Sequence, residues 1–108
     1  MLILEAKVSF DKESDGPHSL PHDLSTKNII RPAINFGNDL LFTGTIVVDK
    51  NIDILIRGKI YNVTIEMPTI EQEAYEEIQS LLRIDGDFKI QNASRIIGKG
   101  KIIDFLYE

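Results

Sequence analysis

Two histidines in one short segment are the side chains whose type and spacing come closest to a chemical site. His18 and His22 lie four residues apart, with Asp15 and Asp23 near them. Four-residue spacing places two imidazoles on one face of a helix, as a metal pair requires, but two prolines break this segment. We therefore expect no metal site here, and we keep His18, His22 and Asp23 as candidate contacts for a binding partner.

The same segment imitates the start of a calcium-binding loop. Residues 11–16 read Asp-Lys-Glu-Ser-Asp-Gly, with the glycine at the required sixth position. The twelfth position, which needs a bidentate glutamate, is His22, and no second helical half surrounds it. We interpret the match as coincidence.

Nucleophilic catalysis lacks its usual residues. The chain has no cysteine, which excludes disulfides, thiol catalysis and cysteine zinc sites. A serine nucleophile would need a histidine base and an orienting carboxylate, and no serine lies in a Gly-x-Ser-x-Gly turn. The sequence thus predicts a protein that is not an enzyme and that uses no cofactor.

Two arginines are sharper binding candidates. Arg31 and Arg95 each open an apolar strand pattern, and each could bind a carboxylate or a phosphate through two hydrogen bonds. The alternative is that they form structural ion pairs, for example with Asp39 or Glu5. The sequence leaves both interpretations open.

The charge balance argues against binding to nucleic acid by charge alone. The 12 basic and 17 acidic residues give a net charge of −5, the wrong sign for holding phosphates. A small acidic protein is better suited to a basic partner surface, because complementary charge speeds encounter and selects partners. The other interpretation is that the charge only keeps the protein soluble.

Alternating apolar residues predict strands over most of the chain. Residues 2–10, 40–48 and 61–67 alternate, Ile52, Ile54 and Ile56 begin a further alternation, and the parity slips at Gly58, which indicates a bulge or a turn. Shorter extended segments lie at 31–36 and 88–90, and a long strand begins at Arg95 and carries the core to Tyr107. Gly98 and Gly100 in that strand fit close packing against another backbone.

One segment has a helical period instead. Ile70, Ala74, Ile78, Leu81 and Leu82 form an apolar stripe, Thr69 and Gln72 match a capping box, and Gly86 suits the left-handed residue after the helix. The outer face carries Glu73, Glu76 and Glu77. It is either a solvated surface or an acidic recognition face.

These elements predict a mainly β protein of one domain over residues 1–108. We expect a six-stranded antiparallel β-barrel with one α-helix inserted around residues 70–83. The segment 11–28 is expected to be a long loop without structure of its own, and such loops are often functional. No apolar run is long enough to span a membrane and no signal peptide is seen, so we expect a cytoplasmic protein.

Two motifs give the chain a resemblance to a known family. The first is Arg31-Pro32-Ala33-Ile34-Asn35-Phe36 followed by Thr43-Gly44-Thr45-Ile46, and the second is Phe88-Lys89-Ile90 followed by Arg95-Ile96-Ile97-Gly98-Lys99-Gly100. With the opening strand and Asp15-Gly16-Pro17-His18, their order resembles the third, C-terminal β-barrel domain of elongation factor Tu. The helix around residues 70–83 is an insertion relative to that family.

The resemblance implies a fold more than a function. No phosphate loop of the GxxxxGK[ST] type exists, so nucleotide binding is not expected. The main hypothesis is a protein-binding module, in one form an inhibitor or immunity-type protein that covers the basic active site of a nuclease toxin. The alternative is a translation-associated tRNA or RNA binder that depends on Arg31, Arg95, Lys99 and Lys101. A third hypothesis is a small hydrolase that uses His18 or His22.

Overall fold

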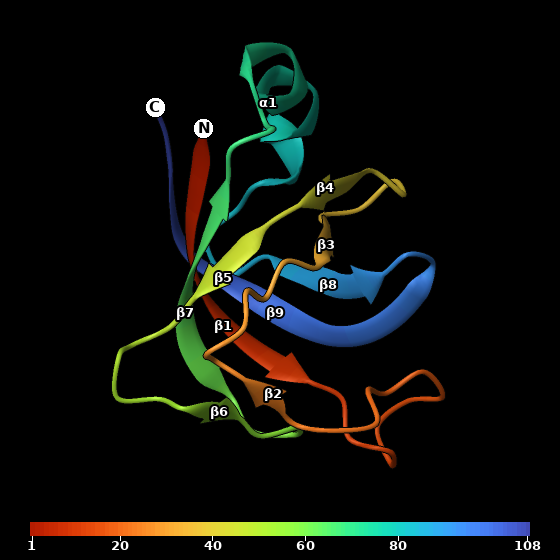
Figure 1. Cartoon of the computed structure of the whole chain (residues 1–108). Coiled ribbons are helices and arrows are strands. Elements are labelled where there is room, and N and C mark those ends of the chain that lie inside the picture. Colours follow the sequence, from red (N-terminus) through yellow and green to blue (C-terminus); the bar gives the residue numbers. More distant parts are fainter.

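The structure, a computed structural model, describes residues 1–108 and is mainly β, as predicted (Figure 1). One short α-helix interrupts the strands near the C-terminal third. The elements are β1 (Leu2–Phe10), β2 (Leu24–Ser25), β3 (Ala33–Asn35), β4 (Leu41–Thr43), β5 (Thr45–Val47), β6 (Ile54–Leu55), β7 (Tyr61–Met67), α1 (Gln72–Ile78), the 3-10 turn η1 (Gln79–Leu81), β8 (Asp87–Asn92) and β9 (Arg95–Tyr107).

Seven strands form one antiparallel sheet in the order β4-β3-β8-β9-β1-β7-β5. Its two edge strands, β4 and β5, are separated along the chain only by Gly44, so the sheet curls into a nearly closed barrel (Figure 1). Two backbone bonds reinforce the closure: the N–H of Gly44 donates to Pro32 over 3.0 Å and that of Ile46 to Ile30 over 2.9 Å. Closure leaves few unpaired strand edges.

The strand count differs from the predicted six because the expected strand over 40–48 divides at Gly44. β4 pairs with β3 and β5 pairs with β7, so the chain changes partner at this glycine. A Cβ atom on Gly44 would lie 2.6 Å from Cγ2 of Ile65 and 3.1 Å from Cγ1 of Ile34. The crossing therefore needs a residue without a side chain.

The predicted alternation in β1 and β7 is confirmed. Their inward residues are buried in the barrel together with those of β8 and β9: Leu2, Leu4, Ala6, Val8, Phe10, Tyr61, Val63, Ile65, Met67, Phe88, Ile90, Ile97 and Ile102. Each large apolar side chain buried in this way contributes about 1.5–3 kcal/mol. Phe36 and Phe88 meet edge to face, with ring centroids 6.1 Å apart.

The prediction that the last strand carries the core as far as Tyr107 is wrong in part. The register between β1 and β9 shifts at Glu5/Ala6, which leaves Ile103 as an extra residue on β9. Such a bulge exchanges the faces that follow it. Ile103 and Leu106 are accordingly exposed, whereas Ile102 is fully buried.

The region around 52–56 is also corrected. Leu55 is fully buried, whereas Ile54 and Ile56 are 50% and 48% exposed, so the predicted parity is reversed. The cause is pairing of β6 with β2, a strand inside the segment 11–28 that we expected to have no structure. Of the bulge or turn predicted at Gly58, the structure has a turn.

The helix lies where predicted but is shorter, because residues 79–81 tighten into η1. Its apolar stripe is confirmed: Ile70, Ile78 and Leu82 are buried, and Ala74 and Leu81 pack against them. The capping box is wrong, since the N-cap is Glu71 without a side-chain bond. The left-handed residue that follows is Asp85, with φ 65°, and not Gly86. Neither helix is long and apolar enough to cross a membrane.

Gly44 gives the first testable prediction. Gly44→Ala forces a methyl group against Ile65 and Ile34, so we expect the free energy of unfolding to fall by about 1–3 kcal/mol in urea denaturation. Gly16→Ala is the matched control, because its Cβ would meet only the flexible end of Asp11. The control should stay within about 0.5 kcal/mol of the parent chain. Equal effects of the two variants would contradict the closure at Gly44.

Candidate functional site

The predicted contact residues separate into two regions of the molecule. Glu73, Glu76 and Glu77 lie on α1, which caps one end of the barrel, whereas His18, His22 and Asp23 lie in the loop near β2 at the other end (Figure 1). The structure therefore does not bring them into one site.

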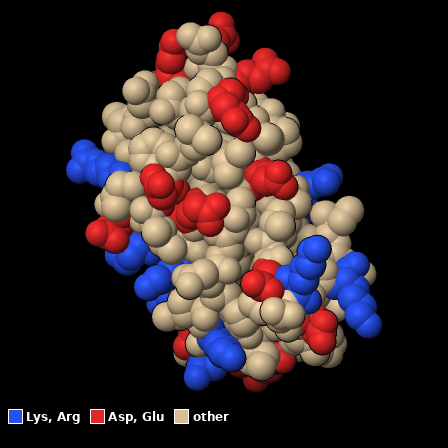
Figure 2. Space-filling model, turned by 90° about the vertical axis from the view of Figure 1, so that its left-hand side faces the viewer, with Lys and Arg blue, Asp and Glu red and all other residues tan.

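Three glutamates of α1 and its N-cap residue form what we call the acidic end: Glu73, Glu76, Glu77 and Glu71. All four are exposed, and the last turn of α1 holds no basic residue. The chain has two salt bridges, and neither includes these residues. Acidic side chains without Lys or Arg among them are seen at the top of Figure 2, where α1 lies.

Packing holds the acidic end in place. A helix of seven residues is not stable by itself, so tertiary contacts must support it. Ile70 and Ile78 are fully buried beneath it, and the ring of Tyr75 stacks on that of Tyr107 with centroids 4.2 Å apart. The glutamates are thus presented from an anchored platform.

Asp23 has a structural partner. Its Oδ1 accepts hydrogen bonds from the backbone N–H of Arg57 over 3.0 Å and from Nε of Arg57 over 3.3 Å. These bonds, the backbone one first, hold the pKa of Asp23 below its ordinary value. Arg57 also donates to the carbonyl of Leu20, so the pair ties the long loop to the Gly58 turn.

The histidines remain exposed, and neither belongs to a cluster of three or more possible metal ligands. His18 and His22 lie at the surface of the same loop. Nowhere in the chain do three or more His, Asp or Glu side chains converge as a metal ion would require.

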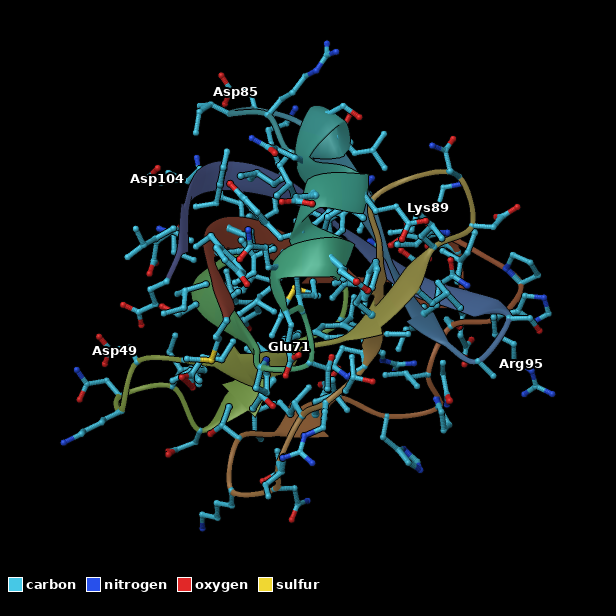
Figure 3. All side chains as sticks on the ribbon, turned by 90° about the horizontal axis from the view of Figure 1, so that it is seen from above. Asp49, Glu71, Asp85, Lys89, Arg95 and Asp104 are labelled. Atoms are coloured by element: carbon cyan, nitrogen blue, oxygen red, sulfur yellow. The ribbon has the colours of Figure 1, made fainter.

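The two arginines do not form the ion pairs that were the alternative to binding. Nε of Arg31 donates to the hydroxyl of Thr45 over 3.2 Å, and Glu5 accepts instead from the hydroxyl of Thr64 over 2.9 Å. Arg95 opens β9 at the tip of the β8–β9 hairpin and points away from the barrel (Figure 3). Both guanidinium groups are free of carboxylate partners.

A cleft that sequence reasoning missed lies across β8, β9 and β1. It has a volume of about 680 Å³ and is lined by Lys7, Lys89, Lys99 and Lys101, by the turn between β3 and β4, and by the apolar residues Val8, Phe36, Ile60 and Phe88. Of these lysines, the sequence analysis singled out only Lys99 and Lys101, as possible RNA contacts. The available signal was the outward parity of each lysine in its strand, but the order of the strands in the sheet cannot be read from that parity.

Titration of Asp23 is the second testable prediction. Because its folded-state pKa is lowered, its stabilising contribution is complete above the ordinary value of 3.8 and is lost as pH falls through the folded-state pKa. In an NMR acid titration, the amide of Arg57 should therefore shift with a midpoint below 3.8, and Asp23→Asn should remove that transition.

Asp11 supplies the internal control for this titration. Burial, with the nearby charge of Asp15, raises the pKa of Asp11, so its own midpoint should lie above 3.8. A midpoint for Asp23 at or above that of Asp11 would contradict the Asp23–Arg57 pair.

Comparison with known proteins assigns this chain to no family. No protein-family model and no curated protein sequence matches it. The two motifs that carry the resemblance lie largely on strands of the sheet: Ala33–Asn35 forms β3 and Arg95 begins β9, whereas Arg31-Pro32 directly precedes β3.

Proposed function

We propose that this chain is a non-enzymatic protein-binding module that docks a basic partner protein through the acidic end. The observation that carries the proposal is the set of four exposed glutamates on an anchored platform, none of them in a salt bridge. Like charges at this density repel one another unless a cation lies among them. A basic partner surface would relieve that repulsion on binding.

Electrostatics favours the docking of a basic protein at the acidic end. The overall charge of −5 attracts a basic partner from a distance, and the acidic end then orients the encounter. Exposed charges interact over about 10 Å at moderate salt, so the attraction is strong at low salt and weak at high salt. Docking through this surface is therefore expected to depend strongly on salt concentration.

The specific form we propose is an inhibitor or immunity-type protein that covers the basic active site of a nuclease toxin. A nuclease binds the negatively charged phosphates of its substrate through cationic side chains. Carboxylates along one short helix can occupy the same cationic groups. Tyr75 and Tyr107 stack beside these glutamates and add an aromatic contact of the kind that anchors interfaces.

We further propose that the barrel is related to the third domain of elongation factor Tu. Support comes from the placement of both motifs on barrel strands and from Gly98, whose missing side chain lets β9 approach the backbone of β1. The nearly closed antiparallel sheet agrees with such a barrel. The finer assignment rests on the motifs.

The alternative of an RNA binder has weaker support. It needs Arg31, Arg95, Lys99 and Lys101 to serve one continuous surface. Lys99 and Lys101 line the cleft, whereas neither arginine does. The net negative charge also opposes a long nucleic acid.

Capture of the partner is the third testable prediction. The immobilised protein should retain a basic protein from a lysate of the cells that encode it, and moderate salt should release that protein. Glu73→Gln with Glu77→Gln should weaken binding by about tenfold or more, because the charges that orient docking are removed.

The control variant removes the same charge elsewhere. Glu13 and Asp53 are exposed and lie outside the acidic end, so Glu13→Gln with Asp53→Asn should leave binding unchanged. The proposal is overturned if the retained partner is acidic, if its binding is insensitive to salt, or if both double variants weaken binding equally.

A further inference from the structure

The cleft across β8, β9 and β1 gathers positive charge on a negatively charged protein. We call it the lysine cleft, lined by Lys7, Lys89, Lys99 and Lys101. All four side chains are exposed, and they come from three strands that are neighbours in the sheet. One third of the 12 basic residues of the chain thus lies around one hollow.

Strand register places these lysines directly opposite one another. Lys89 on β8 pairs with Lys99 on β9, and Lys101 on β9 pairs with Lys7 on β1. Directly opposite residues have Cβ atoms about 4.5–5.5 Å apart, and like charges there destabilise the sheet. Both pairs therefore oppose folding slightly unless an anion lies between the ammonium groups.

Internal carboxylates neutralise only part of this charge. Nζ of Lys101 lies 3.1 Å from Oδ1 of Asp87 and donates to the carbonyl of Asp85. Lys7, Lys89 and Lys99 form no salt bridge. The remaining carboxylate at the cleft is Asp39, so the lining carries four positive and two negative charges.

The shape of the cleft suits a small molecule. Its volume of about 680 Å³ lies within the range of about 300–1,000 Å³ that is usual for small-molecule sites. The turn at Gly37–Asp39 forms one wall, and Asn38 and Asp39 hold left-handed conformations there, with φ of 57° and 56°. Ser9 lies opposite Lys99 and adds a hydroxyl to the lining.

We propose that the lysine cleft binds a small anion that carries several phosphate groups. Lysine ammonium groups bind phosphate as point charges, and a ligand with several phosphates can reach lysines on all three strands at once. A small ligand is favoured over a nucleic acid because a polymer would extend over the acidic remainder of the surface. This site is independent of docking at the acidic end.

Inorganic tripolyphosphate is the probe for the fourth testable prediction. In an NMR titration of the full chain at low salt, it should shift the amides of Lys7, Lys89, Lys99 and Lys101 and of the Gly37–Asp39 turn, while those of α1 stay in place. The apparent affinity should fall as salt is raised. Shifts that are absent, or that spread equally to lysines outside the cleft, would overturn the proposal.

Variants separate binding from folding. Lys99→Gln removes one charge from a repelling pair, so it should lower affinity for tripolyphosphate about tenfold yet raise the melting temperature by about 2 °C. Lys27→Gln, at an exposed lysine outside the cleft, should change neither quantity. An affinity for tripolyphosphate that is equal in both variants would contradict the site.

A second arm distinguishes a small ligand from RNA. A short single-stranded RNA with the same number of phosphates should bind no more tightly than tripolyphosphate, because the cleft recognises phosphate charge within a small volume. Tighter binding of the RNA, lost in Lys99→Gln, would overturn the small-ligand proposal in favour of RNA binding.

Discussion

The close approach of strands at glycines is the constraint on which this structure depends. At Gly44 the chain passes from one edge of the sheet to the other, at a point where Ile34 and Ile65 leave no room for a Cβ atom. At Gly98 a Cβ atom would lie 2.6 Å from the carbonyl oxygen of Ser9, so β9 and β1 can approach only because that atom is missing. A side chain at either position would push the strands apart and open the barrel.

Closure decides where the charges lie. Because the inward residues fill the barrel, the outward residues of β8, β9 and β1 must face solvent, and the lysines occupy those positions. The same closure creates a barrel end on which α1 sits, held by Ile70 and Ile78. The acidic end and the lysine cleft are therefore consequences of one scaffold, because the four lysines lie on strands and three of the four glutamates lie on α1.

Local sequence patterns correctly predicted the elements in which burial repeats regularly from residue to residue. β1 and β7 are buried on one face over their whole length, so alternation located them, and the stripe of α1 located the helix. The errors fall where distant segments decide the outcome. Pairing with β2 reversed the parity at Leu55, and a bulge opposite Glu5 exposed Ile103. The lysine cleft was missed for the same reason. The sequence predicts on which side of its strand each lysine lies, but it does not predict which strands are neighbours in the sheet.

The separation of charge supports the proposal that these surfaces serve binding and not solubility alone. Solubility needs a net charge of sufficient size, which scattered carboxylates supply as well as clustered ones. Here Lys89 faces Lys99 and Lys7 faces Lys101, although the acidic residues outnumber the basic ones. Interleaving the two signs would remove the repulsion within both clusters and stabilise the fold slightly. Arrangements that oppose folding in this way are typical of functional positions, where charges of one sign are held together for a ligand of the other.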